Sequence, residues 1–169
     1  MDRILIIGSC GAGKSTMARK LATKTQLPII HLDQHYWKPG WTEPEVEEWE
    51  KKVSQLIQAE QWIMDGNYSG TFHLIMPRAD TIIFLDFSRW RCLWQILLRW
   101  WKYLGTTRPD LAENCPEHLS LSFLHYVFVF PITHRPRILT WLKKVENSHR
   151  IIRLANRKEV NNFLENLID

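Results

Sequence analysis

Short apolar runs alternate with helical patterns along the chain, and the two periodicities predict its elements. Five runs of four to six residues have the composition of buried strands: Arg3 to Ile7, Leu27 to Leu32, Trp62 to Asp65, Thr81 to Leu85 and Arg150 to Leu154. Apolar residues at steps of three or four predict helices over Lys14 to Ala22, Glu45 to about Glu60, Arg89 to about Tyr103 and Glu159 to Leu167. Such alternation is typical of a parallel sheet covered on both faces, so we expect a three-layer α/β fold.

The stretch between the fourth and fifth strands interrupts this alternation. Residues 88–145 are basic at first and then strongly aromatic, as in SFLHYVFVFP. We interpret this excursion as a lid or substrate subdomain rather than as a separate domain. With 169 residues the chain is long enough for one ordinary globular domain and short for two. We therefore expect a single domain over residues 1–169 that includes the excursion.

Composition and charge narrow the class of protein. The chain is 45% hydrophobic and 24% charged, as globular proteins are, and its net charge of +4 suits an anionic ligand without demanding nucleic acid. The three cysteines, Cys10, Cys92 and Cys115, are too widely spaced for a CxxC pair and fit a reducing cytoplasm. Arg99 and Lys102 interrupt the Trp-rich stretch, so no apolar run is long enough to span a membrane. We expect a cytoplasmic protein without a membrane partner.

The sharpest motif directly follows the first strand. The string Gly8-Ser9-Cys10-Gly11-Ala12-Gly13-Lys14-Ser15 satisfies the Walker A pattern GxxxxGK[ST]. Its glycines let the backbone turn tightly and direct N–H groups at phosphate oxygens. The positive end of the helix that follows also attracts these oxygens. We expect the residues from Gly8 to Thr16 to bind a nucleoside triphosphate. Lys14 would neutralise its β- and γ-phosphates, and Ser15 would ligate Mg²⁺.

Carboxylates at strand ends are the next candidates, because a parallel sheet presents catalytic groups there. Three aspartates follow predicted strands: Asp33, Asp65 and Asp86. One of them is needed beside Ser15 to complete the metal shell. His31 and His35 flank Asp33, but the pattern H-x-D-x-H lacks a fourth ligand, so we expect a packed or hydrogen-bonded His31 and no zinc.

Several segments resemble known families. WIMDGNY at residues 62–68 resembles the strand-Asp-Gly segment of adenylate kinase-like P-loop kinases, in which the aspartate bears on the water shell of the metal. Over essentially the full length, the chain resembles the bacterial DNA topology modulation, or FlaR-like, family through GSCGAGKST, HLDQHYWKPGW, WIMDGNYSGT, TIIFLDFSRWRCL, TRPD and NRKEVNNFL. The resemblance implies a five-stranded sheet in the order 2-3-1-4-5 with a helical lid insertion, and ATP as the nucleotide. It assigns Asp65 to the metal, with Asp86 as the alternative.

The same resemblance bears on the phosphoryl acceptor. In small-molecule kinases of the wider group, a carboxylate after the second strand often holds the acceptor hydroxyl, and Asp33 has that place in this chain. The alternative is that Asp33 only caps the loop that follows it. The acceptor-nucleotide segment DGFPRT of adenylate kinases is DGNYSGT here and lacks the arginine, which argues against AMP as the acceptor. Arg78, slightly downstream, could replace that arginine, but it could equally be a surface residue. Four aromatic residues form either a stacking pocket or a satellite core: Tyr36, Trp37, Trp41 and Tyr68.

The helix predicted from Arg89 has an apolar and a cationic face. Its apolar residues are Trp90, Leu93, Trp94, Leu97 and Trp101, and its cationic face carries Arg91, Arg99 and Lys102. Three interpretations are open: core packing of the apolar face, an anion-binding lid helix, or a nucleic-acid or membrane surface. By resemblance to adenylate kinase-like lids, Arg99 is the first candidate to contact the transferring phosphates, and Arg135 and Arg137 are the second pair.

Together these patterns predict an ATP-dependent kinase that phosphorylates a small-molecule acceptor. The expected catalytic residues are Lys14, Asp33, Arg99 and Arg137, and Ser15 and Asp65 are expected to organise Mg²⁺. The rival hypothesis, suggested by the family label, is a nucleotide-dependent DNA-associated protein that modulates DNA topology. Nucleic acid is the less favoured partner.

Overall fold

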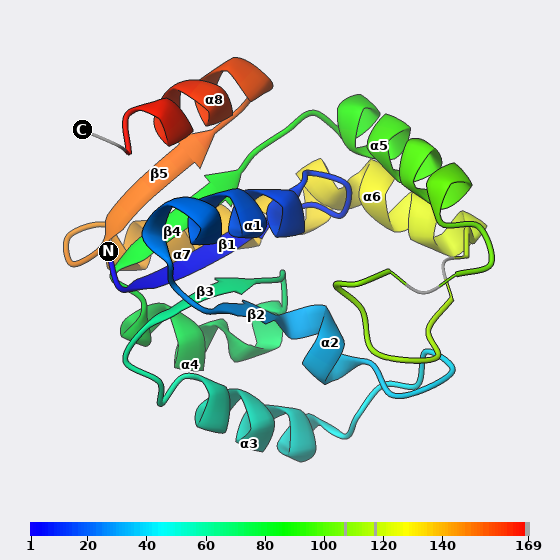
Figure 1. The fold of residues 1–169 in the computed structure, drawn as a ribbon, viewed down its shortest axis with the longest axis horizontal. Helices are drawn as coiled ribbons and strands as arrows, with labels where there is room; N and C mark the ends of the chain where they lie inside the picture. The colour runs from blue at the N-terminus through cyan, green and yellow to red at the C-terminus, as the bar shows by residue number, and fades with distance from the viewer. Residues whose placement is uncertain (107, 117, 168–169) are drawn as a thin grey trace.

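A parallel sheet forms the centre of the molecule. The computed structural model describes residues 1–106, 108–116 and 118–167. The sheet has the order β2-β3-β1-β4-β5, and all neighbouring strands are parallel (Figure 1). Its strands are β1 (Arg3–Gly8), β2 (Ile29–His31), β3 (Trp62–Asp65), β4 (Thr81–Leu85) and β5 (Arg150–Leu154). The predicted α/β class and strand order are confirmed.

Helices link these strands and make up most of the excursion. The first four are α1 (Lys14–Thr25), α2 (Leu32–Tyr36), α3 (Val46–Leu56) and α4 (Phe72–Ile75), with short 3₁₀ turns at Ser69–Thr71 and Met76–Arg78. The others are α5 (Arg89–Lys102), α6 (Leu121–Thr133), α7 (Arg135–Val145) and α8 (Arg157–Glu165). Strands β3, β4 and β5 have the predicted bounds. Helix α6 has no counterpart among the predicted elements, because the aromatic run lacks a clear amphipathic period; α2, α4 and α7 were not predicted either.

Two apolar layers hold the sheet between helices. The residues from Ile4 to Ile7 are fully buried, and alternate ones belong to opposite layers. Leu5 and Ile7 pack with side chains of α3, α4 and α7, whereas Ile4 and Ile6 pack with side chains of α1, α5 and α8. Helix α6 contributes to both layers through Phe130 and Val127. The excursion therefore supplies part of the cover of the sheet.

Most of the apolar face predicted for helix α5 does not pack in the core. Its fully buried side chains are Cys92 and Ile96, which pack against the layer that contains α1. Of the five residues assigned to the apolar face, four are exposed: Trp90, Trp94, Leu97 and Trp101. That interpretation is wrong for these four, because the sheet and α1 cover only the side of α5 that faces the phosphate loop.

The segment between α5 and α6 reaches across to the residues that follow β2. The Gln34 side chain donates a hydrogen bond to the Pro109 carbonyl at 2.6 Å, and the Trp41 indole donates to the Pro116 carbonyl at 3.0 Å. The backbone N–H of Gly40 donates to Asn114 at 3.1 Å. This bridging segment, described over residues 103–106, 108–116 and 118–120, therefore joins the excursion to the region of α2. Within the described ranges, no helix combines the length and apolarity needed to cross a bilayer.

Candidate active site at the phosphate loop

The Walker A residues form a tight loop between β1 and α1. Gly11 has φ +78°, and a Cβ at this position would lie 2.3 Å from the Cys92 carbonyl oxygen, so α5 requires glycine here. Gly13 has φ +92° as the N-cap of α1, and a Cβ there would meet nothing within 4 Å. The loop is thus packed against α5 on one side and faces open space at the start of the helix.

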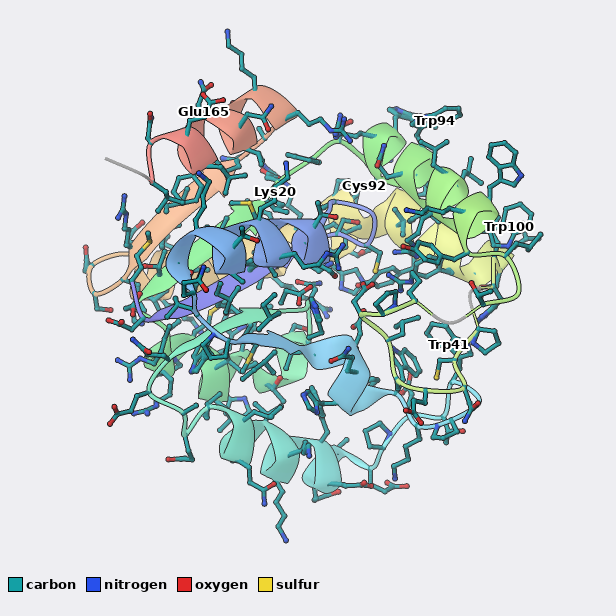
Figure 2. The ribbon with its side chains drawn as sticks, viewed as in Figure 1. Lys20, Trp41, Cys92, Trp94, Trp100 and Glu165 are labelled. Atoms are coloured by element: carbon teal, nitrogen blue, oxygen red, sulfur yellow. The ribbon has the colours of Figure 1, made fainter. Side chains whose placement is uncertain are left out.

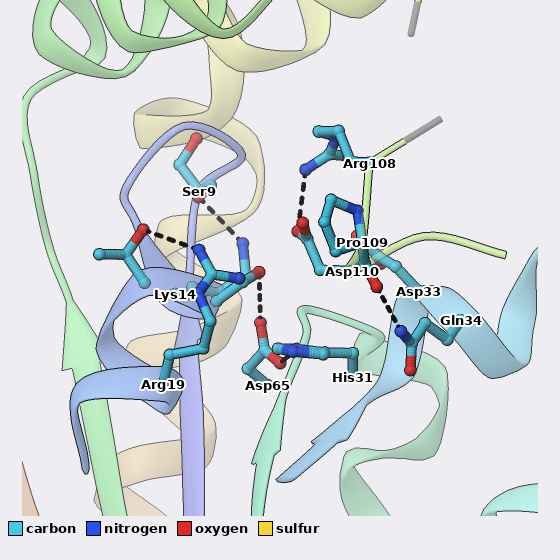
Figure 3. Close-up of polar contacts among 12 residues, drawn as sticks. Ser9, Lys14, Arg19, His31, Asp33, Gln34, Asp65, Arg108, Pro109 and Asp110 are labelled. Carbon is cyan, nitrogen blue, oxygen red and sulfur yellow. Dashed lines mark hydrogen bonds and ion pairs between the residues drawn. The ribbon is translucent and has the colours of Figure 1, made fainter. Parts of the chain in front are cut away.

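Lys14 folds back over this loop. Its ammonium donates hydrogen bonds to the carbonyls of Gly8 and Ser9, each at 3.1 Å, and Figure 3 shows the bond to Ser9. The first turn of α1 contains no acidic residue, so nothing in that turn offsets the positive end of the helix dipole. Backbone, dipole and ammonium together make this end of α1 attractive to anions.

Ser15, Asp65 and His31 form a chain of polar contacts beside the loop. The Ser15 hydroxyl donates to Asp65 Oδ2 at 2.8 Å, and His31 Nδ1 pairs with Asp65 Oδ1 (Figure 3). The strand register explains the meeting, because β3 lies between β1 and β2 and places Asp65 opposite both Ile6 and His31. Burial alone would lower the pKa of His31, but the hydrogen bond and charge of Asp65 outweigh it and raise that pKa above 6.5. His31 therefore helps to hold the carboxylate in place.

A second carboxylate approaches Ser15 from the bridging segment. Arg108 Nη1 donates to Asp110 Oδ2 at 3.0 Å, and both side chains are buried. Burial tends to raise the pKa of Asp110, but the Arg108 charge and a hydrogen bond with Ser15 leave it below its usual range. Figure 3 shows this pair facing Asp65 and His31. An arginine and an aspartate far along the chain thus complete the surroundings of Ser15.

Asp33 lies in a separate group of uncharged polar side chains. The Tyr68 hydroxyl donates to Asp33 Oδ1 at 2.6 Å, and burial followed by the Asp33 charge raises the pKa of Tyr68. Burial also raises the pKa of Tyr126 to about 12, although its hydrogen bond with Asn67 acts in the opposite direction. Both phenols also interact electrostatically with Cys10 of the phosphate loop. The Asp33 group therefore adjoins that loop.

Two arginines form ion pairs with the Asp86 carboxylate. Arg135 forms a bidentate pair with it at 2.8 and 2.9 Å, and Arg153 Nε donates to it at 2.7 Å. Burial would raise the pKa of Asp86, but these two arginines hold it below its usual value. Asp65, rather than Asp86, is the strand-end aspartate that contacts Ser15.

The remaining predicted arginines lie in different surroundings. Arg99 is half-buried on α5, and Arg137 is exposed on α7, where it lines a hollow of about 360 Å³ with Ser69, Gly70, Thr140 and Trp141. Arg78 donates to the Ile57 carbonyl and lies near Asp2 and Arg3, at the edge of the sheet where β1 begins. Since the phosphate loop follows the other end of β1, Arg78 is not placed to contact an acceptor bound there. The roles assigned to Arg99 and Arg137 stay predictions.

The aromatic residues proposed as a stacking pocket pack mainly on one another. Tyr36 contacts Tyr68 and Trp49, with ring centroids 4.4 and 5.0 Å apart, and this group joins the core layer under α3. Trp37 packs edge-on against Trp41 at 5.1 Å. The arrangement agrees with the satellite-core alternative for most of these rings, whereas the Tyr68 hydroxyl points at Asp33.

The oxygen donors at Ser15 fit a magnesium ion. Among the described residues, no cluster of three or more His, Cys, Asp or Glu side chains is arranged to hold a metal. Mg²⁺ commonly takes only one or two protein oxygens and completes its octahedron with phosphates and water. Ser15 and Asp65 provide two oxygens 2.8 Å apart at the end of α1 that attracts phosphate. The donor set matches that mode of binding.

Comparisons with known proteins support the fold. No protein-family model and no curated sequence matches this chain. Among solved structures, it is similar to deoxyadenosine kinase from M. mycoides with bound dCTP, at TM-score 0.50 and 14% identity over 97% of each chain. It is also similar to shikimate kinase from Bacteroides thetaiotaomicron, at TM-score 0.51 and 18% identity over 98% of this chain and 96% of that one. The chain has a P-loop kinase fold.

Within this P-loop kinase fold, sequence reasoning missed Arg108 and Asp110. Both lie in the TRPD segment, which served only as a mark of family resemblance. Nothing local distinguishes these two residues from an ordinary charged loop. Only the path of the bridging segment brings them to Ser15, about ninety residues earlier in the chain.

Proposed function

We propose that the protein is an ATP-dependent kinase that transfers the γ-phosphoryl group to the hydroxyl of a small molecule. The observation that carries the proposal is the meeting of three groups at one edge of the sheet. These are the phosphate loop, the Ser15–Asp65 pair and the Asp33–Tyr68 pair. The P-loop kinase fold supports the same reaction class.

Each group has a distinct task in this mechanism. The loop backbone and Lys14 bind the phosphates of ATP, and Ser15 and Asp65 would hold Mg²⁺. When bound, the ion neutralises charge on the phosphate oxygens. Asp33 accepts a hydrogen bond from the acceptor hydroxyl and aligns it with the γ-phosphorus, while Tyr68 fixes the carboxylate. Arg99 and Arg137 stay candidates for stabilising the transferring phosphoryl group.

The finer assignments rest on the sequence segments quoted above. We propose an adenylate kinase-like type within the FlaR-like group and, from the three free cysteines, a cytoplasmic location. We do not extend the proposal to DNA. On α5, Arg91 lies over the Phe87 ring at 4.8 Å and Lys102 over the Tyr103 ring at 5.2 Å, so both cations contact their own chain.

Nucleotide binding is tested by Lys14→Ala. We expect ATP with Mg²⁺ to raise the unfolding temperature of the wild type, by a stabilisation of about 2.7 kcal/mol at a hundredfold excess over Kd, and to leave the variant almost unchanged. Lys20→Ala is the matched control, since Lys20 is an exposed lysine on the same helix. A Lys14→Ala protein that responds to ATP like the wild type would refute binding at this loop.

The phosphoryl transfer is tested by measuring ADP release. Nucleosides, nucleotides, sugars and small alcohols would be screened separately with ATP and Mg²⁺. We expect one chemical class to accelerate ADP release in the wild type and not in Lys14→Ala. Hydrolysis that no acceptor stimulates would contradict the kinase proposal while leaving nucleotide binding intact.

A further inference from the structure

Exposed apolar side chains gather on two neighbouring helices. Eleven large hydrophobic residues are exposed among the described ones, and nine of them belong to α5, the turn after it or α6. We call these nine the α5–α6 surface: Trp90, Trp94, Leu97, Leu98, Trp101, Leu104, Leu121, Phe128 and Ile132. Figure 2 shows Trp94 on the outer side of α5. No reaction proposed above uses this surface.

The spacing of these residues is that of a helix-packing seam. Along α5 the exposed positions 90, 94, 97 and 101 advance by four, three and four residues. Along α6 the exposed positions 121, 128 and 132 advance by seven and four. With the seven-residue step counted as two turns, both average about 3.7 residues, close to the 3.6 residues of a helical turn, so the exposed side chains lie along one side of each helix. Apart from the contact between Trp90 and Phe128, the described part of this chain supplies no helix that covers either seam.

The two seams form one continuous surface. The rings of Trp90 and Phe128 meet edge to face at 5.6 Å, and Arg89 donates to the Phe128 carbonyl at 3.2 Å. Helices α5 and α6 are thus packed side by side, and their exposed seams adjoin. The opposite side of α5 is closed by Cys92 and Ile96 in the core.

The area of this surface approaches what a stable protein contact needs. Trp90, Trp94 and Trp101 are 68%, 60% and 76% exposed. An aromatic side chain buries about 150–250 Å² when covered, so these three indoles alone offer roughly 400 Å². With six further apolar side chains, the surface exceeds the roughly 300–600 Å² patch of a typical monomer and approaches the roughly 800 Å² per partner of a standard interface.

The cations around the surface argue against a phosphate-rich partner. Arg89 lies over the Phe128 ring at 4.8 Å, and Arg91 and Lys102 lie over rings of their own chain. An anionic membrane or a nucleic acid would need such groups directed outward. Neither α5 nor α6 contains an acidic residue, so a contact between two copies must be apolar at its centre, as the seams are.

We propose that a second copy of this chain covers the α5–α6 surface. A two-fold axis would pair α5 and α6 of one copy with the same helices of the other, so that each surface meets its equivalent. Four helices would then enclose the tryptophans. This assembly does not depend on the nucleotide or on the phosphoryl acceptor.

Sedimentation equilibrium at micromolar concentrations tests the assembly. We expect the wild type to have twice the chain mass of 20.2 kDa. The double variant Trp94→Glu with Leu97→Glu should raise the dimer Kd by about a hundredfold or more, because like charges would face each other in an apolar contact. Val46→Glu is the matched control: Val46 is 67% exposed at the start of α3, and the variant should stay dimeric.

The remaining outcomes are equally decisive. A wild type whose measured mass stays at 20.2 kDa is a monomer and overturns the proposal. Binding of that monomer to phosphatidylserine vesicles or to oligonucleotides would then assign the surface to a membrane or to a nucleic acid instead. A dimer that survives the double variant places the interface elsewhere and also overturns it. If circular dichroism shows that the double variant is unfolded, the single variant Leu97→Gln replaces it, with a weaker but measurable rise in Kd expected.

Discussion

The three aspartates at strand ends have different partners, and their partners define what they can do. Asp33 accepts a hydrogen bond from Tyr68, Asp65 accepts one from Ser15, and Asp86 is held by two arginines. An aspartate paired with two cations has little charge left for a metal. The hydroxyl donors at Asp33 and Asp65, together with the His31 ring beside Asp65, orient each carboxylate and leave other lone pairs available. The surroundings thus fit the orienting role proposed for Asp33 and the metal-binding role proposed for Asp65, and they give Asp86 a structural role.

The role of Asp33 is tested by Asp33→Asn. Loss of the carboxylate removes the strongest acceptor for the substrate hydroxyl, and we expect kcat to fall by about 10² to 10⁴. ATP-dependent stabilisation should be retained, because Lys14 and Ser15 are unchanged. The measurement is ADP release with the acceptor found in the screen.

Tyr68→Phe is the companion to this variant. It removes only the hydroxyl that holds Asp33, so its effect on kcat should be clearly smaller than that of Asp33→Asn. Unchanged turnover in Asp33→Asn would remove Asp33 from the mechanism and leave it the turn-capping role.

At the scale of single residues, prediction from sequence depends on how local the geometry is. The phosphate loop is contiguous and its glycines are required by the turn, so the residue types alone were enough to predict an anion-binding loop. Asp65 was chosen by resemblance, and it does contact Ser15. Arg108 and Asp110 come from a distant segment and have no local signature. The choice between Arg99 and Arg137 as phosphate contacts stays a prediction.

At the scale of elements, Asp86 connects three of them. It follows β4, and its arginines belong to the start of α7 and to β5. The pair with Arg135 fixes the point at which the excursion returns to the sheet. Because the carboxylate is largely buried, its charge depends on both arginines remaining in place.

Asp86→Asn should therefore destabilise the fold. We expect the free energy of unfolding at neutral pH to fall by about 2 kcal/mol, the typical value for hydrogen bonds to a charged group. The arginines hold the pKa of Asp86 below its ordinary value of 3.8 in the folded chain, so its contribution is complete above pH 3.8 and is lost as pH falls further.

Denaturant unfolding at several pH values checks both parts of this prediction. The difference between wild type and Asp86→Asn should be constant near neutrality and should narrow below pH 3.8. Glu165→Gln, which removes an exposed carboxylate at the end of α8, should show neither effect. A gap that persists unchanged in strong acid would mean that the asparagine acts through packing rather than through charge.

Elements were predictable where the apolar period was clear. Strands β3 and β4 are short, buried runs, and β5 is a short, partly exposed run at the edge of the sheet; the bounds of all three were predicted correctly. The α5 sequence showed that an apolar face exists. It did not show what covers that face, since amphipathicity is the same whether the partner is a sheet or another chain. Helix α6 is apolar nearly all round, and its period was therefore hidden.

At the scale of the whole molecule, the candidate site and the α5–α6 surface use different sides of the same helix. The backbone of α5 at Cys92 closes on the phosphate loop, while its tryptophans face outward. The fold is similar to that of two kinases at only 14% and 18% identity, so the architecture is alike although most residues differ. The strand alternation predicted the α/β class, whereas the strand order was implied by the family resemblance. The acceptor depends on the edge residues and is not defined by the fold.

The distribution of tryptophan gives the chain two built-in optical reporters. Trp49 and Trp62 are buried, whereas Trp90, Trp94 and Trp101 are exposed to water. Indole emission shifts to shorter wavelength when water is excluded and to longer wavelength when water is admitted. Covering the exposed set would therefore shift the spectrum to the blue, and unfolding would shift the buried set to the red. Assembly and loss of structure thus have opposite spectral signs in the unlabelled protein.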